Sequence, residues 1–321
     1  MSPTHREGSG LVIKGWLYAL LAVALWSANF VIANKASATI APVELAFYRW
    51  LVAFICLLPF ARPTFARIQD VLKDKREVRR LALTAFTGVS AMNTLIYLAG
   101  KSAPAVDLSL ISVASPAFIV AINRLVFRRR VRSATWLGVG MAMMGCVWLI
   151  GTDGTSSLAG LKVSTGDLLM VVASITFAVY TVVQRAPKGM ADGEYLLLLI
   201  FTGLVGLLPF YLVREALYGC SPITLDTGVY ILYLGVFASL VAFYLWNKSV
   251  KLIGASRTGV SYYALPCFVY LIEYVAGGKV LSGAVVGSFA LIVAGAIVIH
   301  FTTTEATEGA TATSGTGTNE T

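Results

Sequence analysis

The chain has 321 residues, of which 57% are hydrophobic and only 13% are charged, and its mean hydropathy is +0.78. A soluble domain carries about 25% charged residues, so this composition excludes an ordinary water-soluble fold and predicts an all-α integral membrane protein. The net charge of +9 raises nucleic-acid binding as an alternative. The basic residues are scattered between apolar runs, which favours the membrane interpretation.

Apolar runs long enough to cross a bilayer recur along the chain, since a core of about 30 Å needs roughly 20 apolar residues per helix. We predict ten transmembrane helices, at residues 16–34, 44–60, 81–100, 104–126, 135–150, 167–185, 195–213, 228–248, 256–277 and 281–301. Several of these runs are short, so nine or eleven crossings stay open. The predicted segments are a cytoplasmic tail at 1–15, a first five-helix repeat at 16–150, an extracytoplasmic linker at 151–165, a second five-helix repeat at 166–301 and a disordered cytoplasmic tail at 302–321.

The basic residues are distributed unevenly between the two predicted sides of the membrane. With ten crossings, 19 Lys and Arg residues fall on the side of the termini and five on the other, while Arg49 lies inside a span. Cytoplasmic loops of membrane proteins carry the excess of Lys and Arg. The sequence therefore predicts a multi-pass protein of the cell (inner) membrane with both termini in the cytoplasm.

The two halves of the chain resemble each other. Residues 15–35 align without gaps on residues 166–186, residues 97–102 align on 244–249, and Pro116 falls opposite Pro266. With five spans in each half, the second half is inverted in the membrane, as in many secondary transporters, around a central cavity. Shared apolar composition is the alternative explanation, which the matched Lys-Ser pairs and prolines disfavour.

Several short motifs resemble one known family, and their order along the chain is more specific than any one of them. They are Leu25-Trp26-Ser27-Ala28-Asn29-Phe30, Phe47-Tyr48-Arg49-Trp50, Ser115-Pro116-Ala117-Phe118, Leu265-Pro266-Cys267-Phe268 and the glycines Gly138, Gly140 and Gly145. These motifs resemble the drug/metabolite transporter (DMT) superfamily, EamA family, and within it the amino-acid exporters of the YddG type. The resemblance covers roughly residues 12–301 and implies export of aromatic or neutral amino acids. Where that family often has Gly-Glu after the proline helix, this chain has Arg128-Arg129 and Gly278-Lys279.

Polar and aromatic side chains within the predicted spans are candidate substrate ligands, because uncompensated polar groups in lipid are costly and should face protein or a wet path. The candidates are Trp26, Asn29, Asn93, Tyr97, Ser112, Tyr180, Tyr244, Asn247, Tyr262 and Tyr263. Aromatic rings with amide donors and acceptors suit a zwitterion that has an apolar side chain. For each candidate, the alternative is an interhelical hydrogen bond or a place in the interfacial belt, and the belt fits Tyr97 and Tyr244 best because both lie near helix ends.

Four further residues have predicted roles in coupling, gating or structure. Glu273 is a candidate proton or ion carrier, because a buried carboxyl has a raised pKa; the alternatives are a side chain that reaches the outer interface or a static hydrogen bond. Pro116 and Pro266 are predicted helix breaks with a gating function, or else packing kinks. Arg49 is interpreted as structural, reaching the interface or pairing with Glu44 or Asp107.

Other function classes lack their sequence signatures. The chain has no GxxxxGK[ST] and no HExxH, so we predict no enzyme activity, no cofactor and no metal site. An integral membrane enzyme and a channel or receptor remain the alternatives of a different class. Among transporters, a nucleotide-sugar or drug/cation carrier is the alternative; an anion site would need several basic side chains, and only Arg49 and Arg257 are candidates. The predicted partners are a small-molecule substrate, the lipid bilayer and possible protons, with no nucleic acid; the chain could be a monomer or a homodimer.

Overall fold

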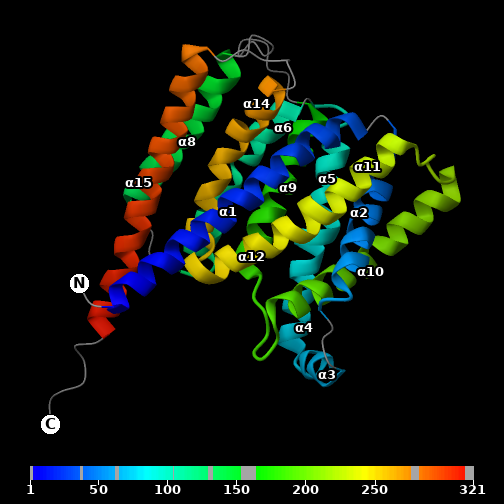
Figure 1. The fold of residues 1–321 in the computed structure, drawn as a ribbon, viewed down its shortest axis with the longest axis horizontal. Helices are drawn as coiled ribbons and strands as arrows, with labels where there is room; N and C mark the ends of the chain where they lie inside the picture. The colour runs from blue at the N-terminus through cyan, green and yellow to red at the C-terminus, as the bar shows by residue number, and fades with distance from the viewer. Residues whose placement is uncertain are drawn as a thin grey trace.

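The computed structural model describes residues 3–36, 39–61, 65–103, 105–128, 133–152, 164–275 and 282–314, and within these ranges every regular element is a helix (Figure 1). The first half contains α1 (Pro3–Ala36), α2 (Pro42–Leu57), α3 (Phe65–Lys73), α4 (Lys75–Ala85), η1 (Phe86–Ala91), α5 (Met92–Ala99), α6 (Ala105–Ser112), α7 (Ser115–Leu125) and α8 (Ser133–Thr152). The second half contains α9 (Thr165–Val183), α10 (Asp192–Tyr218), α11 (Leu225–Tyr233), η3 (Leu234–Val241), α12 (Ala242–Ile253), α13 (Ala255–Val260), η4 (Ser261–Ala264), α14 (Leu265–Val275) and α15 (Gly283–Ser314).

Five continuous helical segments among the described residues are long and apolar enough to cross a bilayer. They are Gly10–Ala33, Lys75–Ala99, Thr165–Val183, Asp192–Tyr218 and Leu225–Ile253. Many large apolar side chains on these segments lie on the outside, among them Leu17, Val205 and Leu232 at 54–59% exposure. An apolar exterior of this kind belongs in lipid, so the chain is an α-helical membrane protein. The total of ten crossings stays a prediction.

Irregular backbone recurs at equivalent places in the two halves. The third apolar helix of each half contains a π-helical segment, η1 (Phe86–Ala91) in one and η3 (Leu234–Val241) in the other. The next helix is broken in both halves: α7 begins at Ser115 and α14 at Leu265, each with its proline in the first turn. A proline there loses no helical hydrogen bond, so Pro116 and Pro266 start new helices instead of kinking continuous ones.

Two elements far apart in the sequence, α8 and α15, pack against each other along their length (Figure 1). A Cβ on Gly138 would lie 2.8 Å from the Gly295 carbonyl oxygen, and one on Gly295 would lie 2.5 Å from the Ala142 backbone nitrogen. A Cβ on Gly145 would come similarly close to Ile292. These glycines therefore let the two backbones approach closely, which is the packing role expected of small residues between membrane helices.

Both ends of the described chain differ from the expected tails. α1 begins at Pro3, within the tail predicted at 1–15, and α15 continues to Ser314, within the disordered tail predicted at 302–321. At the start of this extension, the Thr302 hydroxyl donates to the Val298 carbonyl oxygen at 2.9 Å. Because extending an existing helix avoids the cost of nucleation, a polar segment rich in Ala and Thr can continue it.

Candidate functional site

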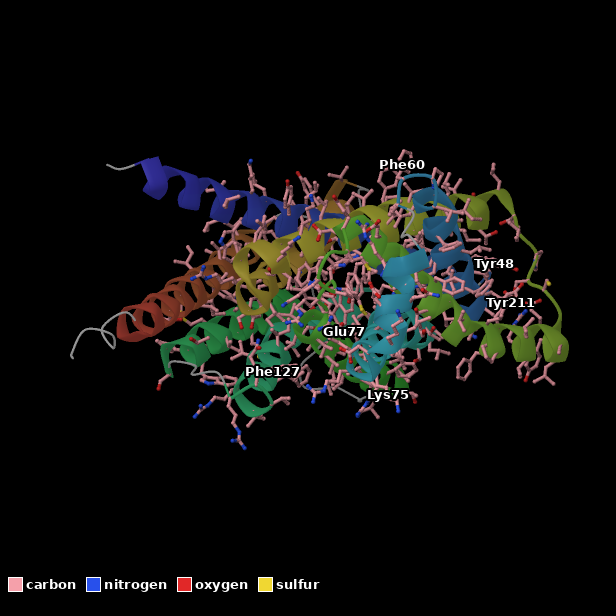
Figure 2. All side chains as sticks on the ribbon, turned by 90° about the horizontal axis from the view of Figure 1, so that it is seen from below. Tyr48, Phe60, Lys75, Glu77, Phe127 and Tyr211 are labelled. Atoms are coloured by element: carbon pink, nitrogen blue, oxygen red, sulfur yellow. The ribbon has the colours of Figure 1, made fainter. Side chains whose placement is uncertain are left out.

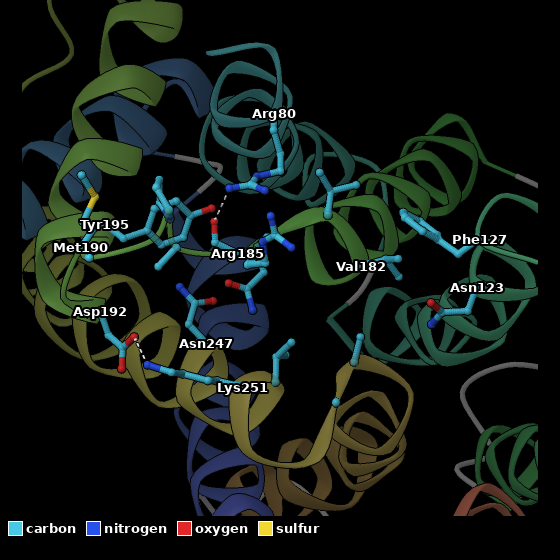
Figure 3. A pocket seen from close by; sticks show the side chains of 18 residues that line it. Arg80, Asn123, Phe127, Val182, Arg185, Met190, Asp192, Tyr195, Asn247 and Lys251 are labelled. Carbon is cyan, nitrogen blue, oxygen red and sulfur yellow. Dashed lines mark hydrogen bonds and ion pairs between the residues drawn. The ribbon is translucent and has the colours of Figure 1, made fainter. Parts of the chain in front are cut away.

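A cavity of about 720 Å³ opens between the ends of six helices (Figure 3). It lies between the beginnings of α4, α10 and α13 and the ends of α7, α9 and α12, and we call the surface at its mouth the basic face, after Arg80, Arg185 and Lys251. Its polar lining residues are Arg80, Asn123, Gln184, Arg185, Asp192, Tyr195, Asn247 and Lys251. This volume is within the range of about 300–1,000 Å³ that holds small metabolites.

The charges at the mouth of the cavity are largely paired. The Lys251 ammonium lies 2.9 Å from an Asp192 carboxylate oxygen (Figure 3). Arg80 pairs with Glu77. Arg80 also donates to the Arg185 backbone carbonyl at 3.1 Å, and the Arg185 side chain lies 3.9 Å from Glu77. The mouth is therefore polar, but two carboxylates offset most of its three basic side chains.

The lining of the cavity includes Asn247, on α12. Its amide oxygen accepts a hydrogen bond from the Tyr180 hydroxyl of α9, and its buried Nδ2 has no partner among the described residues. The Tyr180 ring packs on Gly88 of η1, where a Cβ would lie 2.2 Å from the ring. Tyr180 thus reaches from the wall of the cavity to the π-helical segment of the first half.

Beyond Tyr180, aromatic rings fill the space between the two halves. Trp26 lies 5.3 Å from Phe243, 5.4 Å from Phe177 and 5.1 Å from Trp246, measured between ring centroids. Its indole nitrogen donates to the Ala238 carbonyl oxygen of η3 at 2.8 Å. We define the aromatic cluster as Trp26, Phe177, Tyr180, Phe243, Trp246 and Tyr262, all of which are at most 3% exposed. The cluster is therefore a tightly buried contact of aromatic rings.

Arg49 is fully buried and holds a second polar group together, which we call the Arg49 network. Its Nη1 donates to the amide oxygens of Asn29 at 3.0 Å and Asn93 at 2.8 Å, and to the Tyr97 hydroxyl. Its Nε donates to the Ser239 hydroxyl at 2.7 Å. The network thereby connects α1, α2 and α5 of the first half to η3 of the second.

Two local features allow the Arg49 network to form. A Cβ on Gly235 would lie 2.9 Å from the Arg49 carbonyl oxygen, so glycine lets η3 approach α2 closely enough for Ser239 to reach the guanidinium. On the first half, the Asn93 Nδ2 donates to the Gly88 carbonyl oxygen of η1 at 3.4 Å. A π-helical segment displaces backbone hydrogen bonds and is frequent at functional sites.

A separate group of polar residues lies where α2 begins and α10 ends. Glu44, fully buried, pairs with Arg214 and accepts a hydrogen bond from the Ser221 backbone nitrogen at 3.0 Å. Nearby, the hydroxyls of Tyr48 and Tyr211 lie 3.0 Å apart, and Figure 2 shows the two tyrosines together at one end of the molecule. The partner of Glu44 is therefore Arg214, so the predicted pairing of Arg49 with Glu44 is wrong, whereas the alternative partner Asp107 has a side chain outside the described ones.

The structure brings most of the predicted ligands together, in two groups. Asn29, Asn93 and Tyr97 belong to the Arg49 network, and Tyr97 is fully buried, so its placement in an interfacial belt is wrong. Trp26, Tyr180 and Tyr262 belong to the aromatic cluster, with Asn247 beside it. Their roles as ligands stay predictions.

Other predicted residues lie elsewhere. Ser112 interacts with the Tyr262 hydroxyl from α6, whereas Tyr263 packs in a different apolar cluster with residues of α8 and α15. Tyr244 is half-buried beside the Lys248 ammonium, 5.0 Å from its ring centroid. Glu273 is half-buried in α14, outside the set of residues that line the cavity.

The central position of Arg49 and the polar lining at the mouth of the cavity are not predicted from the residue pattern. An apolar run gives only the depth of a residue in the membrane and says nothing of which neighbours it meets. Arg80 and Arg185 are recognisable in the sequence only as charges on the predicted cytoplasmic side, and Asp192 has no predicted role. A signal for Arg49 was available: an arginine inside an apolar run must be satisfied by protein, and Asn29 and Asn93 are amides at matching depth.

Proteins named as transporters match most of the length of this chain. The chain is 27% identical over 266 residues to an uncharacterized transporter of Archaeoglobus fulgidus, covering 82% of this chain and 89% of that protein. It is 25% identical over 308 residues to a probable amino-acid metabolite efflux pump of Salmonella typhimurium, covering 90% and 95%. A probable terminal-alkyne amino-acid exporter of Streptantibioticus cattleyicolor is 23% identical over 282 residues, covering 88% of this chain and 91% of that protein.

The fold and the family agree with these relatives. A solved crystal structure superposes with a TM-score of 0.67 over 88% of this chain and 95% of that one, at 22% identity, which shows a shared fold. The sequence pattern of the EamA-like transporter family matches the chain twice, at residues 13–151 and 164–301. Because these two matches cover most of the sequence, the protein belongs to the EamA-like transporter family.

Proposed function

We propose that this transporter exports amino acids, chiefly aromatic and neutral ones, from the cytoplasm by alternating access. The observation that carries the proposal is the cavity at the basic face, whose lining residue Asn247 binds Tyr180, a member of the buried aromatic cluster. A transporter that works by alternating access exposes its site to one side at a time, unlike a channel. The described conformation corresponds to the cytoplasm-facing state.

The proposed orientation rests on the charges around the cavity. Arg80, Arg185 and Lys251 surround its mouth, and Lys188 lies in the loop between α9 and α10. Loops rich in Lys and Arg stay on the cytoplasmic side of the membrane. The basic face then meets the cytoplasm, both termini lie on that side, and the cell (inner) membrane is the location.

The chemistry next to the cavity suits an amino acid. Asn247 offers a buried Nδ2 donor with no partner among the described residues, and aromatic rings begin directly behind Tyr180. A carboxylate can accept from an amide donor, and an apolar or aromatic side chain packs favourably on rings. Two relatives, named as an amino-acid metabolite efflux pump and a terminal-alkyne amino-acid exporter, support the same substrate class.

The charges at the cavity mouth are also relevant to a second candidate function, the transport of nucleotide sugars or other anions. Three basic side chains line the mouth of the cavity, which favours this second candidate. Glu77 and Asp192 pair with them, however, so the net positive charge available to a di-anion is small. A zwitterion fits a mouth of mixed charge better.

Coupling to protons is proposed for Glu273, a half-buried carboxyl in the apolar helix α14. A carboxyl in such surroundings can bind and release a proton as the conformation changes. Glu273→Gln should then remove the dependence of transport on a pH gradient while leaving exchange of labelled substrate intact. Unchanged dependence on the gradient would remove this role from Glu273.

The experiment for the proposed function is counterflow in liposomes that contain the purified protein. Vesicles preloaded with an unlabelled amino acid should accumulate the labelled form, with phenylalanine, tyrosine and leucine tested alongside lysine, glutamate and a nucleotide sugar. Accumulation of neutral or aromatic amino acids supports the proposal. Accumulation of the nucleotide sugar alone would contradict it.

A further inference from the structure

Among the described side chains, which do not include Asp107, Arg49 is a buried charge without an acidic partner. Its side chain is fully buried, and the ion pairs among the described residues involve other basic residues: Arg67, Lys73, Arg80, Arg185, Arg214 and Lys251. The acceptors around Arg49 are the neutral oxygens of Asn29, Asn93, Tyr97 and Ser239. Burying a charge without a partner of opposite sign is costly, and neutral acceptors offset only part of that cost.

The guanidinium also keeps one unused set of donors. Nη1 and Nε make all its hydrogen bonds, whereas Nη2 is buried and has no partner among the described residues. A guanidinium binds a carboxylate best through two parallel hydrogen bonds, and Nη2 with Nη1 forms such a fork. Since one side of the fork is already engaged by neutral amides, a carboxylate could displace them without breaking an ion pair.

The surroundings of Arg49 fit the remainder of an amino acid. Its guanidinium carbon lies 5.5 Å from the Trp50 ring centroid and 5.8 Å from that of Tyr97. The Trp50 ring in turn lies 4.8 Å from Phe243, which belongs to the aromatic cluster. The site therefore offers a cation for a carboxylate, amide oxygens for an ammonium group, and rings for an apolar side chain.

A short chain of contacts connects Arg49 with the cavity. Asn247 on the cavity wall binds Tyr180, the Tyr180 ring lies on Gly88, and the Gly88 carbonyl oxygen accepts from Asn93, which binds Arg49. In the described state Tyr180 closes this route. Movement of Tyr180 away from Gly88 would open the cavity toward the guanidinium.

We propose that Arg49 is the residue that recognises the carboxylate of the transported solute, after that solute passes Tyr180. The inference rests on the proposed export of amino acids, and it adds a specificity determinant: the solute must carry a carboxylate. It also gives the neutral partners of Arg49 a role, since they hold the charge in place while the site is empty.

The test compares amino acids with their carboxamides, which keep the ammonium group and side chain but lack the negative charge. Competition with labelled phenylalanine or leucine in liposomes gives the preference of the wild type, expected to be roughly 10- to 100-fold for the carboxylate. Arg49→Gln should abolish this preference. Arg49→Lys, which keeps the charge without the fork, should weaken binding of the amino acid while leaving binding of the carboxamide unchanged.

Three control variants separate recognition from a structural role. Arg214→Gln removes an arginine that has its own acid partner, and Arg80→Gln and Arg185→Gln remove basic residues of the cavity mouth; all three should retain the preference. A preference that is unchanged in Arg49→Gln would overturn the inference, as would its loss in Arg80→Gln or Arg185→Gln. Equal weakening of amino acid and carboxamide in Arg49→Lys would assign Arg49 a structural role and overturn it too.

A second measurement distinguishes failure of this inference from failure of the proposed function. Thermal unfolding of the purified protein in detergent is followed with phenylalanine, phenylalaninamide and phenylacetate. Stabilisation by the two carboxylates, present in the wild type and absent in Arg49→Lys, supports the site even if liposomes transport no amino acid, in which case only the proposed substrate is wrong. Stabilisation that is independent of Arg49, or no stabilisation by any carboxylate, overturns the inference.

Discussion

At the cavity the Tyr180 hydroxyl donates to Asn247, between the first and third apolar helices of the second half. In the Arg49 network the Tyr97 hydroxyl donates to Asn29 at 3.0 Å, between the first and third apolar helices of the first half. The two pairs differ in their surroundings: one borders an open cavity, whereas the other is enclosed by a guanidinium and by Ser239 of the opposite half.

This difference suggests how one fold can have two gates. In each half, a tyrosine and an asparagine join the same two helices next to a π-helical segment. In the proposed mechanism, the hydrogen bond from Arg49 to Ser239 across the halves holds one side closed, and on the other side the charges pair at the mouth of the cavity. We expect the state that opens the far side to reverse these roles.

The largest effect is expected from filling the contact between Tyr180 and η1. A Cβ on Gly88 would lie 2.2 Å from the Tyr180 ring, so Gly88→Val must displace Tyr180 or η1. Overpacking of this kind costs about 1–3 kcal/mol, and transport should fall about tenfold or more. Counterflow rates and thermal unfolding measure both effects. Gly140→Val, where a Cβ would meet nothing within 4 Å, is the control and should change neither.

A smaller loss of transport than in Gly88→Val, with a change in which side is open, is expected when the closed side loses one hydroxyl. Tyr97→Phe removes an acceptor from Arg49 and a donor to Asn29, both buried. Leaving buried polar groups unsatisfied costs about 1–3 kcal/mol, so the closed arrangement should weaken and the opposite side should open more often. Thiol labelling of Ser239→Cys from the side opposite the basic face should increase. No change in labelling would mean that the network does not hold that side closed.

At the cavity, removal of the corresponding hydroxyl should have a milder effect. Tyr180→Phe leaves Asn247 next to space that water can enter, so the loss should be about 0.5–1.5 kcal/mol and transport should fall only a few-fold. Tyr218→Phe, on a 78% exposed residue, serves as the matched control. If Tyr180→Phe lowered the stability of the protein as much as Tyr97→Phe does, the proposed difference between the two sides would be contradicted.

The smallest effect is expected at the cavity mouth. Lys251 is 68% exposed and pairs with Asp192, and exposed ion pairs contribute about 0–1 kcal/mol. Lys251→Gln should change transport less than about twofold, and that change should vanish at high salt because salt screens exposed charges. The test is to measure transport by Lys251→Gln at low and at high salt. A loss of transport that does not depend on salt would assign Lys251 a direct role in binding.

Much of the fold could be predicted from the sequence, because apolar runs, the repeat and the prolines are local signals. The breaks before Pro116 and Pro266 and the close packing of Gly138 and Gly295 follow from such signals. The π-helical segments were not predicted, since nothing in the residue pattern distinguishes them from α-helix.

The candidate site was predictable in its residue types and not in its arrangement. Asn29, Asn93 and Tyr97 were identified as intramembrane polar groups, but their common partner, Arg49, depends on how α2 packs against η3. Tyr262 and its neighbour Tyr263 likewise pack in different clusters, because consecutive residues of a helix face different directions and only the folded chain shows which neighbours each one meets.

The most direct test of the account is thiol accessibility from each side of sealed vesicles of known orientation. In a background where Cys56, Cys146, Cys220 and Cys267 are replaced, Asn247→Cys should react with an impermeant maleimide from the basic face only, while Ser239→Cys should be protected from that side. Saturating substrate should lower the first reaction and allow the second from the opposite side. Reaction of Asn247→Cys from both sides in one state would indicate a continuous pore and contradict alternating access.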